Sequence, residues 1–365
     1  MSLAILGQGG AVPETVIDQR DASGIATALC CRTPEHRTWL PVMYEQTGIR
    51  TRRVQYNPVL IRDLIDGTRH GESIFFPTGE PDDAGPTTAQ RVAIYAQKAG
   101  PLAVQAARKA VRDAKIEPAQ VTHVITVSCT GFVAPGVDHM LIREMRLSPS
   151  VQRTHIGYMG CHGALNGLRV ANAFAADPQA TVLLCAVELC SLHYHYGWDP
   201  QKMIANALFA DGAAALVGSS RGPTGAWQLT ANGSTVLPES ADTMSWTIGD
   251  HGFEMTLSKR VPELIAAQLR PWLHGWLESH NIKPESVPSW AIHPGGPKIL
   301  DAAEKALGLP ATATSAARAV FAEFGNMSSP TVLFIIDRLR RANAPRPCVA
   351  LAFGPGLSVE AALIE

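Results

Sequence analysis

Two stretches of this sequence, residues 121–128 and 181–188, are apolar on both faces of the strands that they would form. Successive side chains of a strand point to opposite faces, so such strands belong in a sheet that is covered on both sides. Segments with helical spacing of small and apolar residues stand between the strand-like runs, the longest over 91–115. This alternation predicts a layered α/β fold.

The alternation continues through the rest of the chain. Further strands are expected at residues 3–7, 154–158, 290–293, 347–353 and 357–364, with another after Phe209-Ala210-Asp211-Gly212. Further helices are expected at residues 164–176, 260–281, 297–308 and 328–341. Residues 71–88 are rich in Gly, Pro, Asp and Thr and predict an exposed loop. The clearest boundary signal lies at 219–226, so two halves are predicted, 1–220 and 221–365.

The composition excludes several classes of partner. Of the 365 residues, 46% are hydrophobic and 17% are charged, and the formal net charge is −1. This balance allows a large core and gives no overall attraction to nucleic acid or membranes. The first residues lack the features of a signal peptide, and no apolar run reaches the roughly 18 residues of a membrane-spanning helix. We therefore expect a cytoplasmic protein with no nucleic-acid or membrane partner.

The seven cysteines argue against a disulfide framework or a zinc site, because their number is odd and no C-x-x-C pair occurs. Cys161 stands out among them. It lies in Met159-Gly160-Cys161-His162-Gly163, between a predicted strand and a predicted helix. A helix N-terminus favours a thiolate, and the neighbouring small residues let a substrate carbonyl approach closely. Taken alone, a cysteine in such a place is more often a buried structural residue than a nucleophile.

Two further residues could complete a catalytic set. His293 ends the strand at 290–293 and begins His293-Pro294-Gly295-Gly296-Pro297, at a strand end of the kind where catalytic groups gather in α/β folds. Asn326 lies in Phe324-Gly325-Asn326-Met327-Ser328-Ser329-Pro330, just before an apolar helix. Each has a structural alternative, because His293 could cap a turn and Asn326 could be an N-cap.

Taken together, these motifs resemble the type III polyketide synthases, the chalcone synthase-like family. The closing Phe353-Gly354-Pro355-Gly356-Leu357 is similar to that family's G-F-G-P-G signature, with Ala352 in place of the first glycine. The segment 208–214, Leu-Phe-Ala-Asp-Gly-Ala-Ala, is similar to its L-F-G-D-G-A-A strand. The motifs occur in the family's order over nearly the whole chain. The resemblance implies a five-layered αβαβα thiolase-like fold, a homodimer, and an active site between the two halves.

The resemblance also implies a mechanism. Cys161 would attack an acyl-CoA thioester as a thiolate, and a protonated His293 would stabilise that thiolate. His293 and Asn326 would donate hydrogen bonds to the enolate that malonyl-CoA forms as it loses CO₂. The carbanion would then attack the acyl group on Cys161. The only small molecules needed are acyl-CoA and malonyl-CoA, with no metal and no separate cofactor.

Cavity and CoA-binding residues follow from the same resemblance. Phe209 is similar to the family's gatekeeper, although a core role is an open alternative, and Ser328 is expected to line the cavity. Cys129, His193 and Met255 replace two threonines and a phenylalanine of the plant enzymes, which argues against chalcone as the product. An aliphatic starter and a pyrone or resorcinol product would suit the smaller number of aromatic cavity residues.

The CoA phosphates need basic residues at a tunnel mouth. Arg50, Arg52 and Arg53 form a cluster in the region similar to the family's CoA-binding segment, and Lys298 follows the His293 turn. Of these we expect Arg50, Arg53 and Lys298 to bind CoA. An ordinary solvated charged surface is the alternative.

Four alternative interpretations share parts of the pattern. A ketoacyl-ACP synthase III has the same fold, a cysteine and a G-N-x-S element, but its histidine stands in a different motif from His293-Pro294-Gly295-Gly296. A hydroxymethylglutaryl-CoA synthase would need a glutamate near the cysteine strand, and Glu188 lies too far along the chain to assign. A papain-type hydrolase fits the order of Cys, His and Asn but lacks the local signature. A non-catalytic scaffold would not need the intact set of three.

Overall fold

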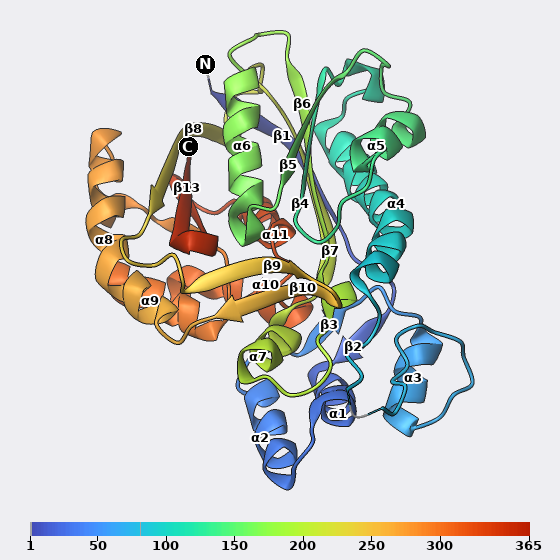
Figure 1. Cartoon of the computed structure of the whole chain (residues 1–365). Coiled ribbons are helices and arrows are strands. Elements are labelled where there is room, and N and C mark those ends of the chain that lie inside the picture. The colour runs from blue at the N-terminus through green and yellow to red at the C-terminus, as the bar shows by residue number, and fades with distance from the viewer. Residues whose placement is uncertain (1, 81) are drawn as a thin grey trace.

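A computed structural model describes residues 2–80 and 82–365 and shows one nine-stranded mixed sheet (Figure 1). The strand order is β11-β12-β13-β8-β1-β7-β6-β4-β5. The strands are β1 (Leu3–Ala11), β4 (His123–Ser128), β5 (Gln152–Gly157), β6 (Thr181–Leu189), β7 (Asp211–Ser219), β8 (Gln228–Val236), β11 (Ser289–Ile292), β12 (Cys348–Gly354) and β13 (Ser358–Ile364). Strand β4 is parallel to β5 and β6, and β11 is parallel to β12, whereas the other neighbours are antiparallel.

The sheet consists of two leaves joined at a short seam. The first leaf contains β5, β4, β6, β7 and β1, and the second contains β8, β13, β12 and β11. Strand β1 pairs with β7 along its length but with β8 only at Leu3 and Ala4. The loop predicted as a boundary, 219–226, lies at the end of β7 and before β8.

Helices form three layers around the two leaves, which confirms the predicted five-layered arrangement. Helices α4 (Thr88–Ala114) and α5 (Val137–Met145) cover the first leaf, while α8 (Val261–Ser279) and α9 (Pro297–Leu307) lie outside the second (Figure 1). Between the leaves lie α6 (Gly163–Phe174) and α11 (Pro330–Arg341), and each contacts strands of both.

Small residues allow the middle layer to pack this closely. A Cβ on Gly167 of α6 would lie 2.6 Å from Leu184 Cδ1 and 3.2 Å from Val127 Cγ2. Both of those residues are in strands of the first leaf and are buried. The glycine therefore lets α6 approach the strands that carry the apolar runs from which the fold was predicted.

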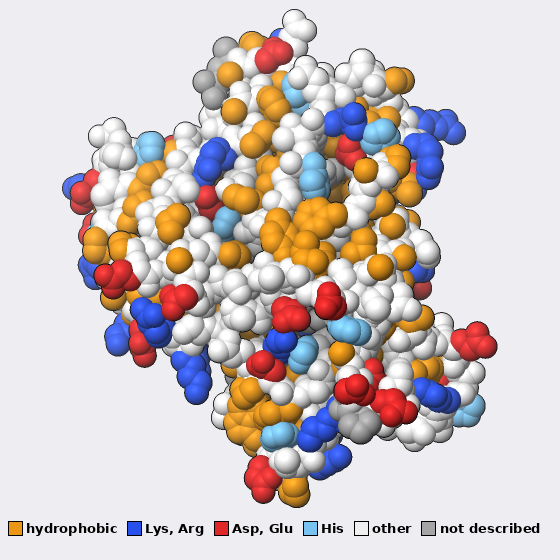
Figure 2. All heavy atoms as spheres, in the orientation of Figure 1, with side chains coloured by type: hydrophobic (Ala, Val, Ile, Leu, Met, Phe, Trp, Pro, Cys, Tyr) orange, Lys and Arg blue, Asp and Glu red, His pale blue; other side chains and the backbone are white. Residues whose placement is uncertain are grey.

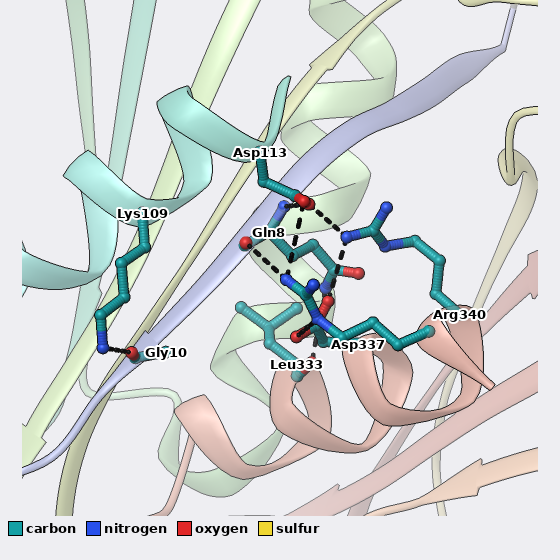
Figure 3. Close-up of polar contacts among 8 residues, drawn as sticks. Gln8, Gly10, Lys109, Asp113, Leu333, Asp337 and Arg340 are labelled. Atoms are coloured by element: carbon teal, nitrogen blue, oxygen red, sulfur yellow. Dashed lines mark hydrogen bonds and ion pairs between the residues drawn. The ribbon is translucent and has the colours of Figure 1, made fainter. Parts of the chain in front are cut away.

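A polar network ties the outer helix α4 to the middle helix α11 across β1 (Figure 3). The Asp113 carboxylate accepts a hydrogen bond from the Gln8 backbone N–H at 2.9 Å and pairs with Arg340. Arg340 also pairs with Asp337 at 3.1 Å. Lys109 Nζ donates to the Gly10 carbonyl at 2.8 Å. These groups fix how the two helices sit on the strand between them.

Sequence periodicity did not predict the remaining elements, most of which lie at one end of the molecule, below the sheet in Figure 1. They are α1 (Gln19–Cys30), α2 (Pro34–Glu45), α3 (Pro58–Asp66), α7 (Pro200–Leu208), the pair β2 (Val16–Asp18) and β3 (Thr51–Arg53), and the hairpin of β9 (Met244–Gly249) and β10 (Gly252–Leu257). Helix α10 (Ser315–Phe324) packs on α11 and was also not predicted. In residues 2–80 and 82–365, no helix is both long and apolar enough to cross a membrane.

Candidate active site

Cys161 lies at the junction of strand and helix that the sequence predicted. It is in a short 3₁₀ turn, Gly160–His162, between β5 and α6, and its side chain is buried. The chain reaches this turn through left-handed backbone at Tyr158, with φ of 61°, and at Gly160, with φ of 73°. A Cβ on Gly160 would also lie 2.7 Å from Pro355 Cδ. Strained backbone of this kind gathers at functional sites.

Burial raises the pKa of the Cys161 thiol to about 11, so the free chain holds it as a thiol. Ser328 and Asn326 oppose this rise, because hydrogen bonds to sulfur favour the thiolate. The charge of Glu188 acts in the opposite direction. The backbone N–H of the turn also lowers the pKa, but burial outweighs it, so the helix N-terminus alone does not activate the cysteine.

Asn326 is not the N-cap of α11, since Ser329 occupies that position. Instead it pairs with the chain at Phe209: its N–H donates to the Leu208 carbonyl and its carbonyl accepts from the Ala210 N–H, both at 2.9 Å. Its side-chain Oδ1 accepts from the Ser328 N–H at 2.8 Å, and Ser328 has left-handed backbone with φ of 58°. This contact uses only the amide oxygen, so the two N–H donors of the amide serve other acceptors, the Cys161 sulfur among them.

His293 directly follows β11, and its N–H donates to the Leu351 carbonyl at 2.8 Å. Its ring is fully buried, and neither ring nitrogen has a hydrogen-bond partner among the described residues. Burial, and secondarily the charge of His162, lowers the pKa of His293 to about 3. The free chain therefore holds a neutral imidazole, and the expected thiolate–imidazolium pair requires a proton transfer that burial opposes.

Five of the predicted residues meet in one cavity, which we call the catalytic chamber. The empty space within it and at its opening to solvent is about 330 Å³. The residues that line it are Cys129, Thr130, Gly160, Cys161, Cys190, Phe209, Met244, Trp246, Met255, Ser328 and Pro355. His293 and Asn326 are not among the described lining residues and are 0% and 1% exposed. Asn326 is bonded to the chain on both sides of the lining residue Phe209, and the charge of His162, next to Cys161, acts on His293. A Cβ on Gly296, in the His293 turn, would lie 3.6 Å from Leu208 Cδ1.

A second, larger cavity shares a wall with the first, and we call it the apolar chamber; its empty space, including its opening to solvent, is about 990 Å³. Phe209, Cys190, Trp246 and Met255 line both chambers. Much of the remaining wall comes from the unpredicted elements and is largely apolar: Ile17, Ala22, Ile25, Leu29, Val54, Leu60, Ile61, Leu64 and Phe75. Phe209 therefore stands where a gatekeeper between two spaces would stand.

His193 lines the apolar chamber and is locked in place. Its Nδ1 accepts from the Phe253 N–H at 3.0 Å, so Nε2 carries the proton and donates to the Thr130 carbonyl at 2.7 Å. The ring stacks on Phe253 with centroids 4.1 Å apart. Burial lowers the pKa of His193 to about 4, so it is a neutral part of the wall. Trp246 and Phe253 add aromatic rings to the wall, although few aromatic cavity residues were expected from the sequence.

Glu188, left unassigned from the sequence, lies next to the catalytic chamber. Its fully buried carboxylate accepts hydrogen bonds from Ser329 Oγ at 2.6 Å, from Thr130 Oγ1 at 2.8 Å and from the Cys129 N–H at 3.0 Å. Burial raises the pKa of Glu188, and these donors oppose the rise. The carboxylate thus joins β6 to the segments that carry Cys129 and Ser328. Its position on a buried strand gave no sequence signal beyond an acidic residue in an apolar run.

The predicted CoA-binding residues lie outside both chambers. Arg50 is exposed, and its backbone N–H donates to the Ala322 carbonyl at 2.8 Å. Arg53 is half-buried and reaches the Glu14 carbonyl at 3.4 Å. Lys298 is exposed on the first turn of α9. None of the three is among the described residues that line the chambers, so their contact with CoA stays a prediction.

Both halves of the chain match models of one known protein family. Residues 2–221 match the N-terminal domain of chalcone and stilbene synthases, and residues 228–365 match the C-terminal domain. The chain belongs to the chalcone and stilbene synthase family. It is therefore a type III polyketide synthase, an enzyme of the acyltransferase type.

Individual relatives agree with this assignment. Over 371 residues the polyketide synthase is 31% identical to Mycobacterium tuberculosis Pks18, described as alpha-pyrone synthesis polyketide synthase-like, covering 99% of this chain and 90% of Pks18. It is 33% identical over 272 residues to the 1,3,6,8-tetrahydroxynaphthalene synthase of Streptomyces peucetius, with 72% of each chain covered. The crystal structure of PKS-I from the brown alga Ectocarpus siliculosus superimposes with a TM-score of 0.90 at 31% identity, covering 100% of this chain and 98% of that one.

Proposed function

We propose that this polyketide synthase condenses malonyl-CoA units repeatedly onto an acyl-CoA starter held as a thioester on Cys161. The observation that carries the proposal is the catalytic chamber, where the Cys161 thiol meets Ser328 and Phe209 and opens past a shared wall into a larger space. A chain that grows on a cysteine needs both a nucleophile and room to extend.

The loading step transfers the starter from CoA to the enzyme. Cys161 attacks the thioester carbonyl, the bond to CoA breaks, and the Cys161 proton passes to the departing CoA thiolate. A neutral His293 is suited to carry that proton, since one ring nitrogen accepts while the other donates. Because the pKa of Cys161 is raised and that of His293 is lowered, the proton moves as the new bond forms.

In the extension step, Asn326 and His293 act as hydrogen-bond donors. Malonyl-CoA loses CO₂, and the electrons of the broken C–C bond form an enolate of acetyl-CoA. The amide NH₂ of Asn326 and the N–H of His293 both serve as donors to the enolate oxygen, each worth about 3 kcal/mol of barrier. The enolate carbon then attacks the acyl group on Cys161 and displaces the thiolate. The extended chain returns to Cys161 for the next cycle.

The apolar chamber supports an acyl starter with a hydrophobic tail. Its aliphatic wall from α1 and α3 would bury such a tail at roughly 0.8 kcal/mol for each CH₂ group. Phe209, Cys129, His193, Met255 and Ser328 would shape the space around the starter and the growing chain. We propose a pyrone or resorcinol-type product, in keeping with the alpha-pyrone synthesis named for the Pks18 relative.

The remaining features of the proposal concern partners. CoA thioesters are the substrates, Arg50, Arg53 and Lys298 hold the CoA phosphates, and no separate cofactor takes part. Two copies join along the edge strand β5, beside which Phe132, Val133 and Met159 are 44%, 40% and 38% exposed. Figure 2 shows hydrophobic side chains gathered on this face of the molecule, above the β9–β10 hairpin of Figure 1. The seven unpaired, buried cysteines suit a reducing cytoplasm.

The test is incubation of the purified protein with radiolabelled malonyl-CoA and a panel of acyl-CoA starters, with Cys161→Ala as the control. We expect products of more than one extension from the wild type and none from the variant. A single condensation that requires malonyl-ACP would instead indicate a ketoacyl-ACP synthase III activity. Elution from a sizing column at the mass of one chain would contradict the homodimer.

A further inference from the structure

Arg52 was expected to belong to a basic surface cluster, but its side chain is buried, with only 4% exposed. It lies in β3, and no carboxylate of the described residues comes within ion-pair distance of it. Burying a guanidinium without a counter-charge is costly. The surroundings of Arg52 must therefore supply negative potential in another form.

The C-terminus of α7 supplies it. Arg52 Nη1 donates to the Asn206 carbonyl at 2.6 Å and to the Phe209 carbonyl at 2.9 Å. The last carbonyls of a helix have no partner within the helix and carry the negative end of its dipole. The Tyr44 ring adds a cation–π contact, with Cζ 5.7 Å from the ring centroid. The cation is thus stabilised by a helix end and, beyond ion-pair distance, by the buried Asp211 carboxylate, whose pKa burial raises and the charge of Arg52 lowers.

The same helix end positions Asn326 and Phe209, the two residues proposed to face the substrate. The Leu208 carbonyl, which lies between the two that Arg52 binds, accepts from the Asn326 N–H at 2.9 Å. The Phe209 side chain projects from this turn into both chambers. The Arg52 stem also reaches the other side of the bridge: a Cβ on Gly325, where φ is 72°, would lie 3.0 Å from Arg52 Cγ.

We propose that Arg52 is a positioning residue for the decarboxylation step, because it fixes the turn at 208–210 to which Asn326 is bonded. This inference rests on the proposed function, in which the Asn326 amide donates to the enolate oxygen. Loading of Cys161 needs no enolate, so Arg52 acts on one half-reaction and not on the other. Arg52 lies in the wall of the apolar chamber, and its proposed role acts through the turn at 208–210 and not through the reacting atoms.

The test compares Arg52→Met with the wild type in two separate assays. Loading is followed by mass spectrometry of the acyl group on Cys161, and decarboxylation by conversion of malonyl-CoA to acetyl-CoA. We expect unchanged loading but a decarboxylation kcat lower by about 100-fold, the effect of a misplacement of about 1 Å, with little change in KM. Arg52→Lys keeps a donor for the two carbonyls and should recover most of the rate.

Arg91→Met is the matched control. Arg91 is also fully buried, forms no ion pair in residues 2–80 and 82–365, and donates to the Pro86, Leu192 and Tyr194 carbonyls at 2.7, 2.5 and 3.0 Å. Its loss should lower stability in the same way without touching the bridge at 208–210. If Arg91→Met slows decarboxylation as much as Arg52→Met does, or if Arg52→Met slows loading equally, the positioning role is wrong.

Hydrogen exchange separates failure of this inference from failure of the proposed function, because it needs no substrate. The Ala210 and Asn326 amides should exchange faster in Arg52→Met than in Arg91→Met or the wild type. If the wild type never decarboxylates malonyl-CoA but Arg52→Met still speeds exchange of these amides, the proposed function is wrong. Arg52 would then remain the residue that holds the Asn326 turn. An active wild type whose exchange and kcat are both unaffected by Arg52→Met would reject the inference alone.

Discussion

Substitution of Gly354 by alanine tests how tightly the closing Phe353-Gly354-Pro355-Gly356 segment packs against His162, the neighbour of the proposed nucleophile Cys161. The backbone at Gly354 is extended, with φ of −157°, so alanine meets no conformational penalty there. Its Cβ, however, would lie 2.2 Å from His162 Cδ2, 2.7 Å from His162 Nε2 and 3.2 Å from the Met159 carbonyl. The glycine is therefore required by contact and not by backbone angle.

The size of the effect follows from these distances. Carbon atoms are comfortable at about 3.5–4.0 Å, so the His162 ring must move by more than about 1 Å. The ring is 3% exposed and is held by Asn166 Oδ1 at 2.7 Å from Nδ1, which leaves it little room. We expect a loss of about 1–3 kcal/mol in the free energy of unfolding. Because His162 adjoins Cys161, we also expect condensation to slow by about 100-fold.

Urea unfolding and the condensation assay measure the two effects, and two companion variants make them interpretable. In Gly354→Ala with His162→Ala the new methyl group enters the space of the missing ring, so the double variant should be less destabilised than the two single effects predict. Gly275→Ala, in an open position of α8, should be neutral or stabilising by up to about 1 kcal/mol. Full stability and rate in Gly354→Ala, or strict additivity in the cycle, would refute the steric argument.

Three further predictions rest on the chambers and the buried groups. The buried His293 ring takes up a proton only in the unfolded chain, so the free energy of unfolding should fall as pH drops from about 6.5 toward 3. Urea unfolding at several pH values measures this dependence. His293→Gln should reduce the slope of unfolding free energy against pH by up to about 1.4 kcal/mol per pH unit. Glu188→Gln should shift the pH profile of Cys161 alkylation by iodoacetamide to lower pH, since the charge of Glu188 raises the pKa of that thiol; an unshifted profile would contradict this. Ala22→Phe should fill part of the apolar chamber and lower kcat/KM for long acyl-CoA starters relative to short ones, and equal losses for both lengths would argue against an acyl tail there.

The parts of the molecule that could be predicted from the sequence are those with local signals. The doubly covered strands were recognised because their side chains are apolar on both faces, and Cys161 because small residues mark a strand-to-helix junction. Arg52 could not be predicted to be buried, because what compensates its charge is the end of a helix more than a hundred residues away. Glu188 was missed for a similar reason, since its hydrogen-bond donors come from two other segments. The β9–β10 hairpin has half-exposed faces and so lacks a clear pattern, yet it brings Trp246 and Phe253 to the chambers.

The short seam between the leaves has a consequence for the integrity of the enzyme. Cys161 starts a middle-layer helix that belongs to the first half, whereas Asn326 precedes the middle-layer helix of the second. A chain cut in the loop at 220–227 would leave each fragment with an incomplete site and with a largely apolar helix facing water. Recovered condensation after mixing the two fragments would then report their assembly directly, and it would do so without any added label. In the proposed mechanism, catalysis therefore depends on the contact between the two halves.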